Sequence, residues 1–84
     1  MAQEDLQLEI ISPDKVLFND VITLVEVPGK QGRFALLRDH APIISVLQEG
    51  SIRVQKKSGE ELNFDCKAGY IECADNHISI LLNN

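Results

Sequence analysis

The sequence predicts an all-β fold, in which short strands form one small sandwich or flattened barrel. Apolar and polar residues alternate along several short runs, which is the pattern of antiparallel strands with one buried face. Five glycines and three prolines separate these runs and leave no segment for a long amphipathic helix. The 84 residues suffice for one domain with a small core. The number and spacing of the runs predict eight to ten strands.

Four runs alternate regularly, and their apolar members are predicted to face the core. In chain order these members are Leu6, Leu8 and Ile10; Ile52 and Val54; Leu62, Phe64 and Cys66; and Ile78, Ile80 and Leu82. Residues 57–60 and 74–77 carry the turn sequences of two-residue hairpins. Residues 28–32 predict a third and longer turn, in which Gly29 and Gly32 are both expected to adopt positive φ.

The run from 21 to 27 is apolar on both faces. A regular strand here places the three valines of the run on one face, and Ile22 and Leu24 on the other. An antiparallel sheet can leave one face to water, so a second apolar face needs a cover. That cover is either another part of the chain or a partner protein.

Composition and charge narrow the classes of function. The net charge is −5, and basic residues do not cluster beyond Lys56 and Lys57. Nucleic acids and anionic membrane surfaces are held mainly through lysine and arginine, so we expect neither as a direct partner. Residues 1–5 are polar and show no secretory signal, and apolar runs such as 80–82 are too short to span a bilayer. A soluble protein facing the cytosol is expected.

No arrangement of residues indicates catalysis. Asp39 and His40 are adjacent, so on a strand their side chains would point to opposite faces, and Ser45 lacks the sequence of a nucleophile turn. The histidines and cysteines lack the spacing of a metal site, and no phosphate-binding glycine loop is present. Cys66 and Cys73 are expected to be reduced, structural thiols. We therefore predict no catalytic residue, no metal and no cofactor.

The central part of the sequence contains a Pro28-Gly-x-x-Gly-x-Phe34 turn followed at fixed spacing by His40-Ala-Pro42. With these motifs it resembles the amino-terminal domain of the epsilon subunit of F-type ATP synthases. Residues 8–18 are similar to the opening strand and corner of that family, and residues 69–81 to its closing hairpin. Altogether the resemblance covers roughly residues 6–82.

Several expectations follow from the resemblance alone. It implies a ten-stranded sandwich of two five-stranded antiparallel sheets in a non-catalytic subunit of the rotating central stalk. The implied partners are the gamma subunit and the c-subunit ring, and the implied role is to couple proton transport to ATP synthesis. The implied location is the cytoplasmic face of the bacterial inner membrane, with membrane association only through the complex.

The resemblance also assigns two contact surfaces. The ring-facing surface is the turn formed by Gly29, Lys30, Gln31, Gly32 and Arg33. The gamma-facing surface contains Ser12, Ile22, Leu24, His40, Ala41, Pro42 and Ser45. His40 has an alternative role in internal packing and backbone hydrogen bonding, and Pro42 has one in stiffening an edge segment. Some relatives carry an acidic residue at the position of Arg33, so the charge of that contact is expected to differ here.

Longer relatives continue into a carboxyl-terminal helical pair that binds ATP and inhibits hydrolysis, whereas this sequence ends at Asn84. We expect a single domain over residues 1–84, a natural short form without either activity. The alternative interpretation is a lipoyl- or biotinyl-carrier domain, which is a flattened β-barrel of similar size. It requires a lysine at a hairpin tip, and the sequence contexts of Lys15 and Lys67 do not fit.

Overall fold

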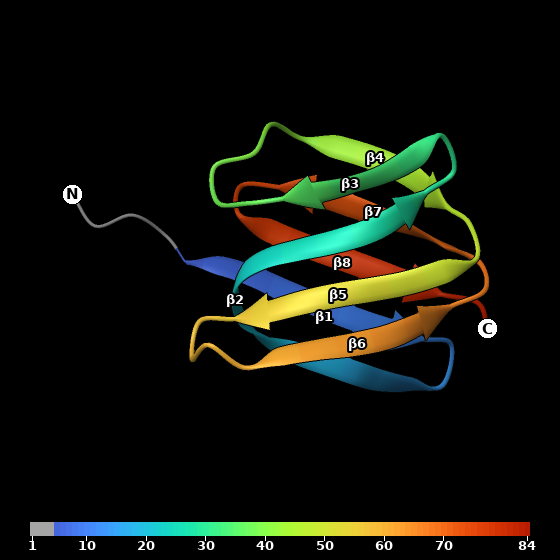
Figure 1. Cartoon of the computed structure of the whole chain (residues 1–84), viewed down its shortest axis with the longest axis horizontal. Helices are drawn as coiled ribbons and strands as arrows, with labels where there is room; N and C mark the ends of the chain where they lie inside the picture. Colours follow the sequence, from blue (N-terminus) through green and yellow to red (C-terminus); the bar gives the residue numbers. More distant parts are fainter. Residues whose placement is uncertain (1–4) are drawn as a thin grey trace.

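The computed structural model describes residues 5–84, which form eight β-strands and no helix (Figure 1). The strands are β1 (Leu6–Ser12), β2 (Lys15–Gly29), β3 (Gly32–Leu36), β4 (Ile43–Leu47), β5 (Gly50–Lys56), β6 (Glu61–Cys66), β7 (Gly69–Ala74) and β8 (His77–Leu82). The prediction that the chain starts without a secretory signal rests mainly on residues 1–4, which lie outside the described residues.

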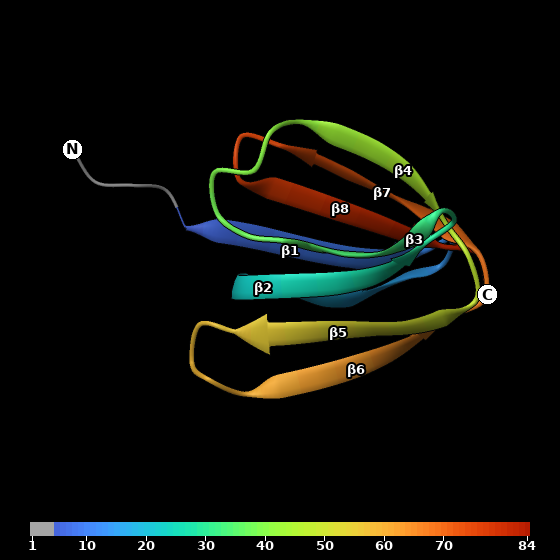
Figure 2. The same ribbon diagram turned by 45° about the horizontal axis from the view of Figure 1, so that its top comes forward.

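The strands form two layers that share β2. The second half of β2 pairs with β3 on one side and β5 on the other, and β6 follows β5; we call this layer sheet A. The first half of β2 pairs with β1, and β8, β7 and β4 follow in order; we call this layer sheet B. Figure 2 shows the layers spread apart at one end and close together at the end where the C-terminus lies. There, Gly29 of β2 pairs with Leu47 of β4.

The all-β class and the sandwich architecture are confirmed, with two differences in detail. The described residues contain eight strands, so the count of ten is not confirmed. The pair β1–β8 is parallel, so the expectation of two purely antiparallel sheets is wrong for sheet B. A parallel pair is possible here because β1 and β8 lie at opposite ends of the chain, and the whole domain serves as their crossover connection.

The core lies between the layers and is apolar throughout. The predicted inward-facing residues of β1, β5 and β8 are all buried, as is Cys66 of β6. Leu62 and Phe64 of β6 are partly buried and pack against this core. The ring of Phe64 also meets that of Phe18 edge to face, with 5.7 Å between ring centroids. These contacts hold the outer strand β6 against the first half of β2 across the sandwich.

The predicted facing of residues 21–27 is wrong because β2 contains a bulge. The register between β2 and β5 shifts between Ile22 and Leu24, so Thr23 is an extra residue opposite β5. An extra residue reverses the side-chain alternation after it. Ile22 therefore lies in the core with Val25 and Val27. Leu24 remains on the outer face, and Val21 also faces away from the core; both are half-buried. The chain itself covers most of the second apolar face.

The turns differ partly from their predictions. Asp75 and Asn76 form the expected two-residue hairpin, with φ values of 52° and 62°. The β5–β6 connection has three residues instead of two: the Lys56 amide bonds to the Glu60 carbonyl, and Gly59 adopts a φ of 101°. This is the common three-residue loop with a glycine that permits positive φ.

Candidate functional site

A row of apolar side chains crosses the outer face of sheet B. In register, Val46 of β4 pairs with Tyr70 of β7, and Tyr70 pairs with Leu81 of β8. Leu81 then pairs with Ile11 of β1, and Ile11 with Val16 of β2. Directly paired residues present their side chains on the same face of a sheet. The five residues therefore form one line across all five strands, which we call the apolar row.

The apolar row is open to water at several points. Val46 is 56% exposed, Tyr70 45% and Val16 58%, while Leu81 and Ile11 are half-buried. Ile44, two residues before Val46 on the same side of β4, is 72% exposed. Beside the row, Pro13, Val46, Tyr70 and Leu81 contribute to a shallow hollow of about 350 Å³. A continuous exposed apolar surface of this kind is typical of a protein-interaction site.

The outer face of sheet A has the opposite character. Arg53 of β5 bonds to Glu26 of β2 at 3.2 Å and to Glu61 of β6 at 3.2 Å. Arg33 of β3 approaches the same Glu26 oxygen at 3.4 Å. These ion pairs join all four strands of the sheet. These charged groups are paired within the chain and accessible to solvent, so this face is stable in water without a partner protein.

Hydrogen bonds and ion pairs lower the pKa values of two carboxyl groups, those of Glu26 and Asp20. The guanidinium of Arg53, followed by that of Arg33, lowers the pKa of Glu26 below its ordinary value of 4.5. The Val21 amide donates to Asp20 at 2.7 Å and, together with Lys56, lowers the pKa of that carboxyl. In both cases the hydrogen bonds favour the ionised form.

The structure does not bring the predicted gamma-facing residues together. Ser12 ends β1 beside the apolar row, whereas the loop that contains His40, Ala41 and Pro42 lies at the opposite end of the sandwich (Figure 1). Leu24 lies on the outer face of sheet A, away from the row. Ile22 is only 2% exposed and belongs to the core, so its assignment to an outer patch with Leu24 is wrong.

Ser45 and the predicted ring-facing turn line one groove. Ser45 pairs with the fully buried Ile71, so its side chain points to the inner side of β4. The groove of about 580 Å³ between β3 and β4 is bordered by Ser45, by Phe34 and by the residues 29–33. The surface formed by Gly29 to Arg33 is thus one compact hairpin, and Ser45 belongs beside it instead of in the apolar row.

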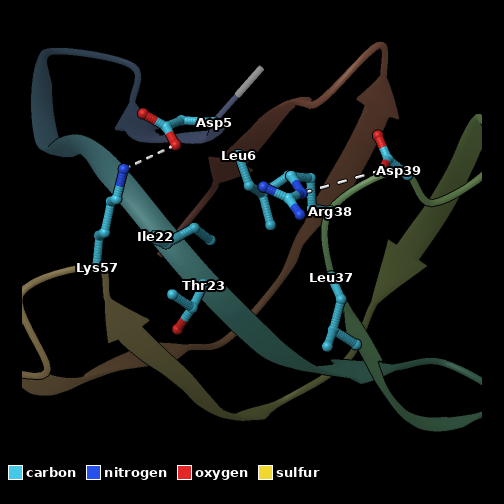
Figure 3. Close-up of a pocket in the computed structure, with 8 residues that line it drawn as sticks. All are labelled: Asp5, Leu6, Ile22, Thr23, Leu37, Arg38, Asp39 and Lys57. Atoms are coloured by element: carbon cyan, nitrogen blue, oxygen red, sulfur yellow. Dashed lines mark hydrogen bonds and ion pairs between the residues drawn. The ribbon is translucent and has the colours of Figure 1, made fainter. Parts of the chain in front are cut away.

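His40 is exposed and close to its own backbone. Its ring Nδ1 lies 2.7 Å from the carbonyl oxygen of Ala41, which matches the backbone-bonding alternative for this residue. Preceding it, Leu37, Arg38 and Asp39 border a pocket of about 440 Å³. Figure 3 shows that the charged side chains in this pocket are paired: Lys57 with Asp5 at 3.0 Å, and Arg38 with Asp39 at 3.9 Å. The pocket therefore presents matched charges and no set of groups suited to catalysis.

Cys66 and Cys73 are buried and unpaired, as predicted for structural thiols, and burial raises the pKa of both. Within residues 5–84, no group of three or more His, Cys, Asp or Glu side chains is placed to hold a metal ion. That same part of the chain has no helix long and apolar enough to cross a membrane.

Comparison with known proteins decides the family. Residues 5–84 match the family described as "ATP synthase, Delta/Epsilon chain, beta-sandwich domain". The chain belongs to this family. The match covers the whole described sandwich, and it gives no support to the lipoyl- or biotinyl-carrier alternative.

Relatives within the family are named ATP synthase epsilon chain. The one from Leptospira borgpetersenii is 38% identical over 82 residues, which cover 96% of this chain and 63% of the relative. The one from Syntrophomonas wolfei is 30% identical and is covered to 59% of its length. The one from Chlorobium limicola is 31% identical and is covered to 94%. This chain therefore spans less than two thirds of the first two relatives and nearly all of the third.

Two solved structures contain chains with the same fold as this chain. A chain of the Euglena gracilis mitochondrial ATP synthase superimposes with a TM-score of 0.88 at 15% identity, covering 95% of this chain and 51% of that one. A chain from the Tetrahymena thermophila mitochondrial ATP synthase superimposes with a TM-score of 0.80 at 14% identity, covering 100% and 67%.

Sequence reasoning missed the apolar row, although a signal for it is present. Apolar residues occur in adjacent pairs at Ile10–Ile11, Ile43–Ile44, Val46–Leu47 and Leu81–Leu82. On a strand, each pair sends one side chain inward and one outward. Only the strand register aligns the outward members into a single row.

Proposed function

We propose that this chain is a non-catalytic central-stalk part of an F-type ATP synthase. It links the gamma subunit to the c-subunit ring and thereby couples proton transport to ATP synthesis. It works at the cytoplasmic face of the bacterial inner membrane and is attached to the membrane only through the complex. Family membership supports this proposal, and the apolar row is the observation that carries it.

The contrast between the two sheets supports sheet B as the face for gamma. Burial of apolar surface contributes roughly 25 cal/mol per Å², so the apolar row favours a protein partner. The outer face of sheet A already satisfies its charges within the chain. Ser12 adjoins the row next to Ile11, and Pro42 leads directly into β4 at the other end. The proposed gamma surface is the apolar row, with Ser12 and the 40–42 loop at its borders.

The hairpin from Gly29 to Arg33 is the proposed ring-facing surface. Arg33 is paired with Glu26, so its charge is partly balanced within the chain. The contact with the polar loops of the ring therefore falls to Lys30, to Gln31 and to backbone groups of the turn. Because Glu26 pairs with Arg33, the proposed contact does not require an acidic residue on the ring opposite Arg33.

The test is co-purification with the gamma subunit encoded by the same organism. The unmodified chain is expected to purify with gamma as a one-to-one complex. Val46→Asp is expected to break or strongly weaken that complex, because it buries a carboxylate in the apolar contact. Leu24→Asp on sheet A is the matched control and should bind normally. A complex weakened by Leu24→Asp and unaffected by Val46→Asp would contradict the assignment of gamma to sheet B.

A further inference from the structure

Three residues other than glycine adopt positive φ in residues 5–84, and all belong to two loops at one end of the sandwich. Asp39 has a φ of 65° and lies in the β3–β4 loop. Asp75 and Asn76 form the β7–β8 turn. Figure 1 shows the two loops at the same end of the sandwich, where β1 begins. The β3–β4 loop passes from sheet A to sheet B, whereas the β7–β8 turn lies within sheet B.

Asp39 and Asn76 join these loops by two reciprocal hydrogen bonds. The Asp39 amide donates to Oδ1 of Asn76 at 2.6 Å. In return, Nδ2 of Asn76 donates to Oδ1 of Asp39 at 3.0 Å. The carbonyl oxygen of Asn76 also accepts from the Gln7 amide of β1 at 2.9 Å, which ties the turn to sheet B. We call the reciprocal pair Asp39–Asn76 the loop clamp.

We propose that Asn76 is a positioning residue that holds His40, Ala41 and Pro42 in the orientation required by the gamma subunit. The inference rests on the proposed function, because that function assigns this segment to gamma. Residues 37–42 are exposed, and the loop clamp fixes the backbone immediately before His40. A loop ordered before binding loses less entropy when the partner arrives, so a clamp of this kind increases affinity without touching the partner.

The chemistry of the two side chains suits this role. Asparagine and aspartate are the side chains that best tolerate positive φ. The asparagine amide offers both an acceptor for the Asp39 amide and a donor for the Asp39 carboxylate. A carboxylate in its place would keep the acceptor and oppose a second carboxylate at about 3 Å, where like charges repel. The loop clamp therefore requires one amide and one carboxylate side chain, and exchanging the residue types at positions 39 and 76 tests this requirement.

Three variants and one control test the proposal. Asn76→Gly keeps the positive φ and removes both hydrogen bonds of the loop clamp. Asn76→Asp keeps the shape and places two carboxylates against each other. The double variant Asp39→Asn with Asn76→Asp restores one donor amide and one carboxylate with their positions exchanged. Asn63→Asp, on the outer face of sheet A, adds the same charge far from the loop and is the control.

The first measurement is amide hydrogen exchange in the isolated chain, which needs no partner. Exchange of the Asp39 amide is expected to be about tenfold faster in Asn76→Gly, which removes both hydrogen bonds, and in Asn76→Asp, in which repulsion between the two carboxylates separates the loops. A tenfold change corresponds to roughly 1.4 kcal/mol. The double variant and Asn63→Asp are expected to keep the slow exchange of the unmodified chain. Unchanged exchange in Asn76→Gly would overturn the loop clamp, whatever the partner is.

The second measurement is affinity for gamma with the same proteins. Asn76→Asp is expected to bind about tenfold more weakly, with affinity restored in the double variant and retained in Asn63→Asp. Thermal unfolding of each variant checks that all are equally folded. If Asn76 only supported the fold, equally folded variants would bind gamma with equal affinity, and exchanging the two residue types would not change that affinity. Equal affinity of the unmodified chain and Asn76→Asp would overturn the proposal. If the unmodified chain does not bind gamma, the proposed function and the positioning role fail, while the exchange measurement still decides whether the clamp exists.

Discussion

At Gly29, a methyl group would lie 2.6 Å from the carbonyl oxygen of Gly32 and 2.7 Å from the ring of Phe34. Gly29 does not adopt positive φ, so its predicted reason for being glycine is wrong: it is required for space. Gly32 follows the prediction, with a φ of 136° and no atom within 4 Å of the position that a Cβ would occupy. Two glycines of one hairpin are thus required for different physical reasons.

Replacing Gly29 by alanine should therefore destabilise the sandwich. The added methyl group meets a backbone oxygen that cannot move without breaking the turn, and overpacking of this kind costs about 1–3 kcal/mol. Denaturant unfolding of Gly29→Ala measures this loss. Gln31→Ala, at the exposed tip of the same turn, is the control and should unfold like the unmodified chain. Equal stability of both variants would show that the turn accommodates the methyl group.

The two thiols lead to a second prediction at the scale of single residues. Cys66 and Cys73 are 2% exposed, and burial raises the pKa of both, so little reactive thiolate reaches solvent at neutral pH. A thiol reagent such as DTNB should react with neither cysteine in the native chain and with both after denaturation. Rapid reaction of the native chain would contradict the burial of these side chains.

Among the elements, β2 was the hardest strand to predict and most of the others were simple. Strict alternation identified β1, β5, β6 and β8 together with their inward-facing residues, because one face of each strand packs on a single core. The bulge at Thr23 left no mark in the hydrophobic pattern, since both possible facings of 21–27 are apolar. The apolar row likewise depends on register between strands distant in sequence, which one chain's pattern does not encode.

The lowered pKa values of Asp20 and Glu26 make stability depend on pH. The folded-state pKa values of Asp20 and Glu26 are lowered, so in acid the unfolded chain binds protons before the folded chain does. Their stabilising contribution is fully present above the ordinary pKa values of 3.8 and 4.5, and is lost as pH falls through the lower folded-state values. Unfolding measured from neutral pH to about pH 2 should show stability decreasing over this acidic interval.

Glu26→Gln isolates one contribution to this pH dependence. The variant retains a side chain of the same shape but has no carboxyl group to titrate between Arg53 and Arg33. Its stability should fall less steeply with decreasing pH than that of the unmodified chain. Gln55→Glu, which adds a carboxyl group on the same face, is a control for the number of acidic groups. An identical slope in Glu26→Gln would show that Glu26 contributes nothing to acid sensitivity.

For the whole molecule, the two ends of the sandwich carry different loops. The β2–β3 hairpin lies at the end where the layers converge, and the β5–β6 and β3–β4 loops lie at the other end (Figure 1). The proposed ring contact belongs to the first end only. This polarity would fix the orientation of the domain in the stalk, with the apolar row facing sideways between the ends.

Cysteine cross-linking in the membrane-bound complex tests that orientation. Gln31→Cys, at the tip of the β2–β3 hairpin, should form cross-links to c subunits through a short thiol-reactive reagent. Ser58→Cys, in the β5–β6 loop at the far end, should form none. Because both native cysteines are buried, neither should contribute background reaction. Cross-links from Ser58→Cys alone would reverse the proposed orientation.

Strand β2 gives the domain a mechanical property that neither sheet has alone. Its fifteen residues run without interruption from sheet B through the bulge into sheet A. Sliding one layer past the other would therefore have to deform a covalent backbone, in addition to disturbing side-chain contacts in the core. In the proposed stalk role, such a strand would act as a rigid strut, and a load applied to one face would reach the other with little deformation.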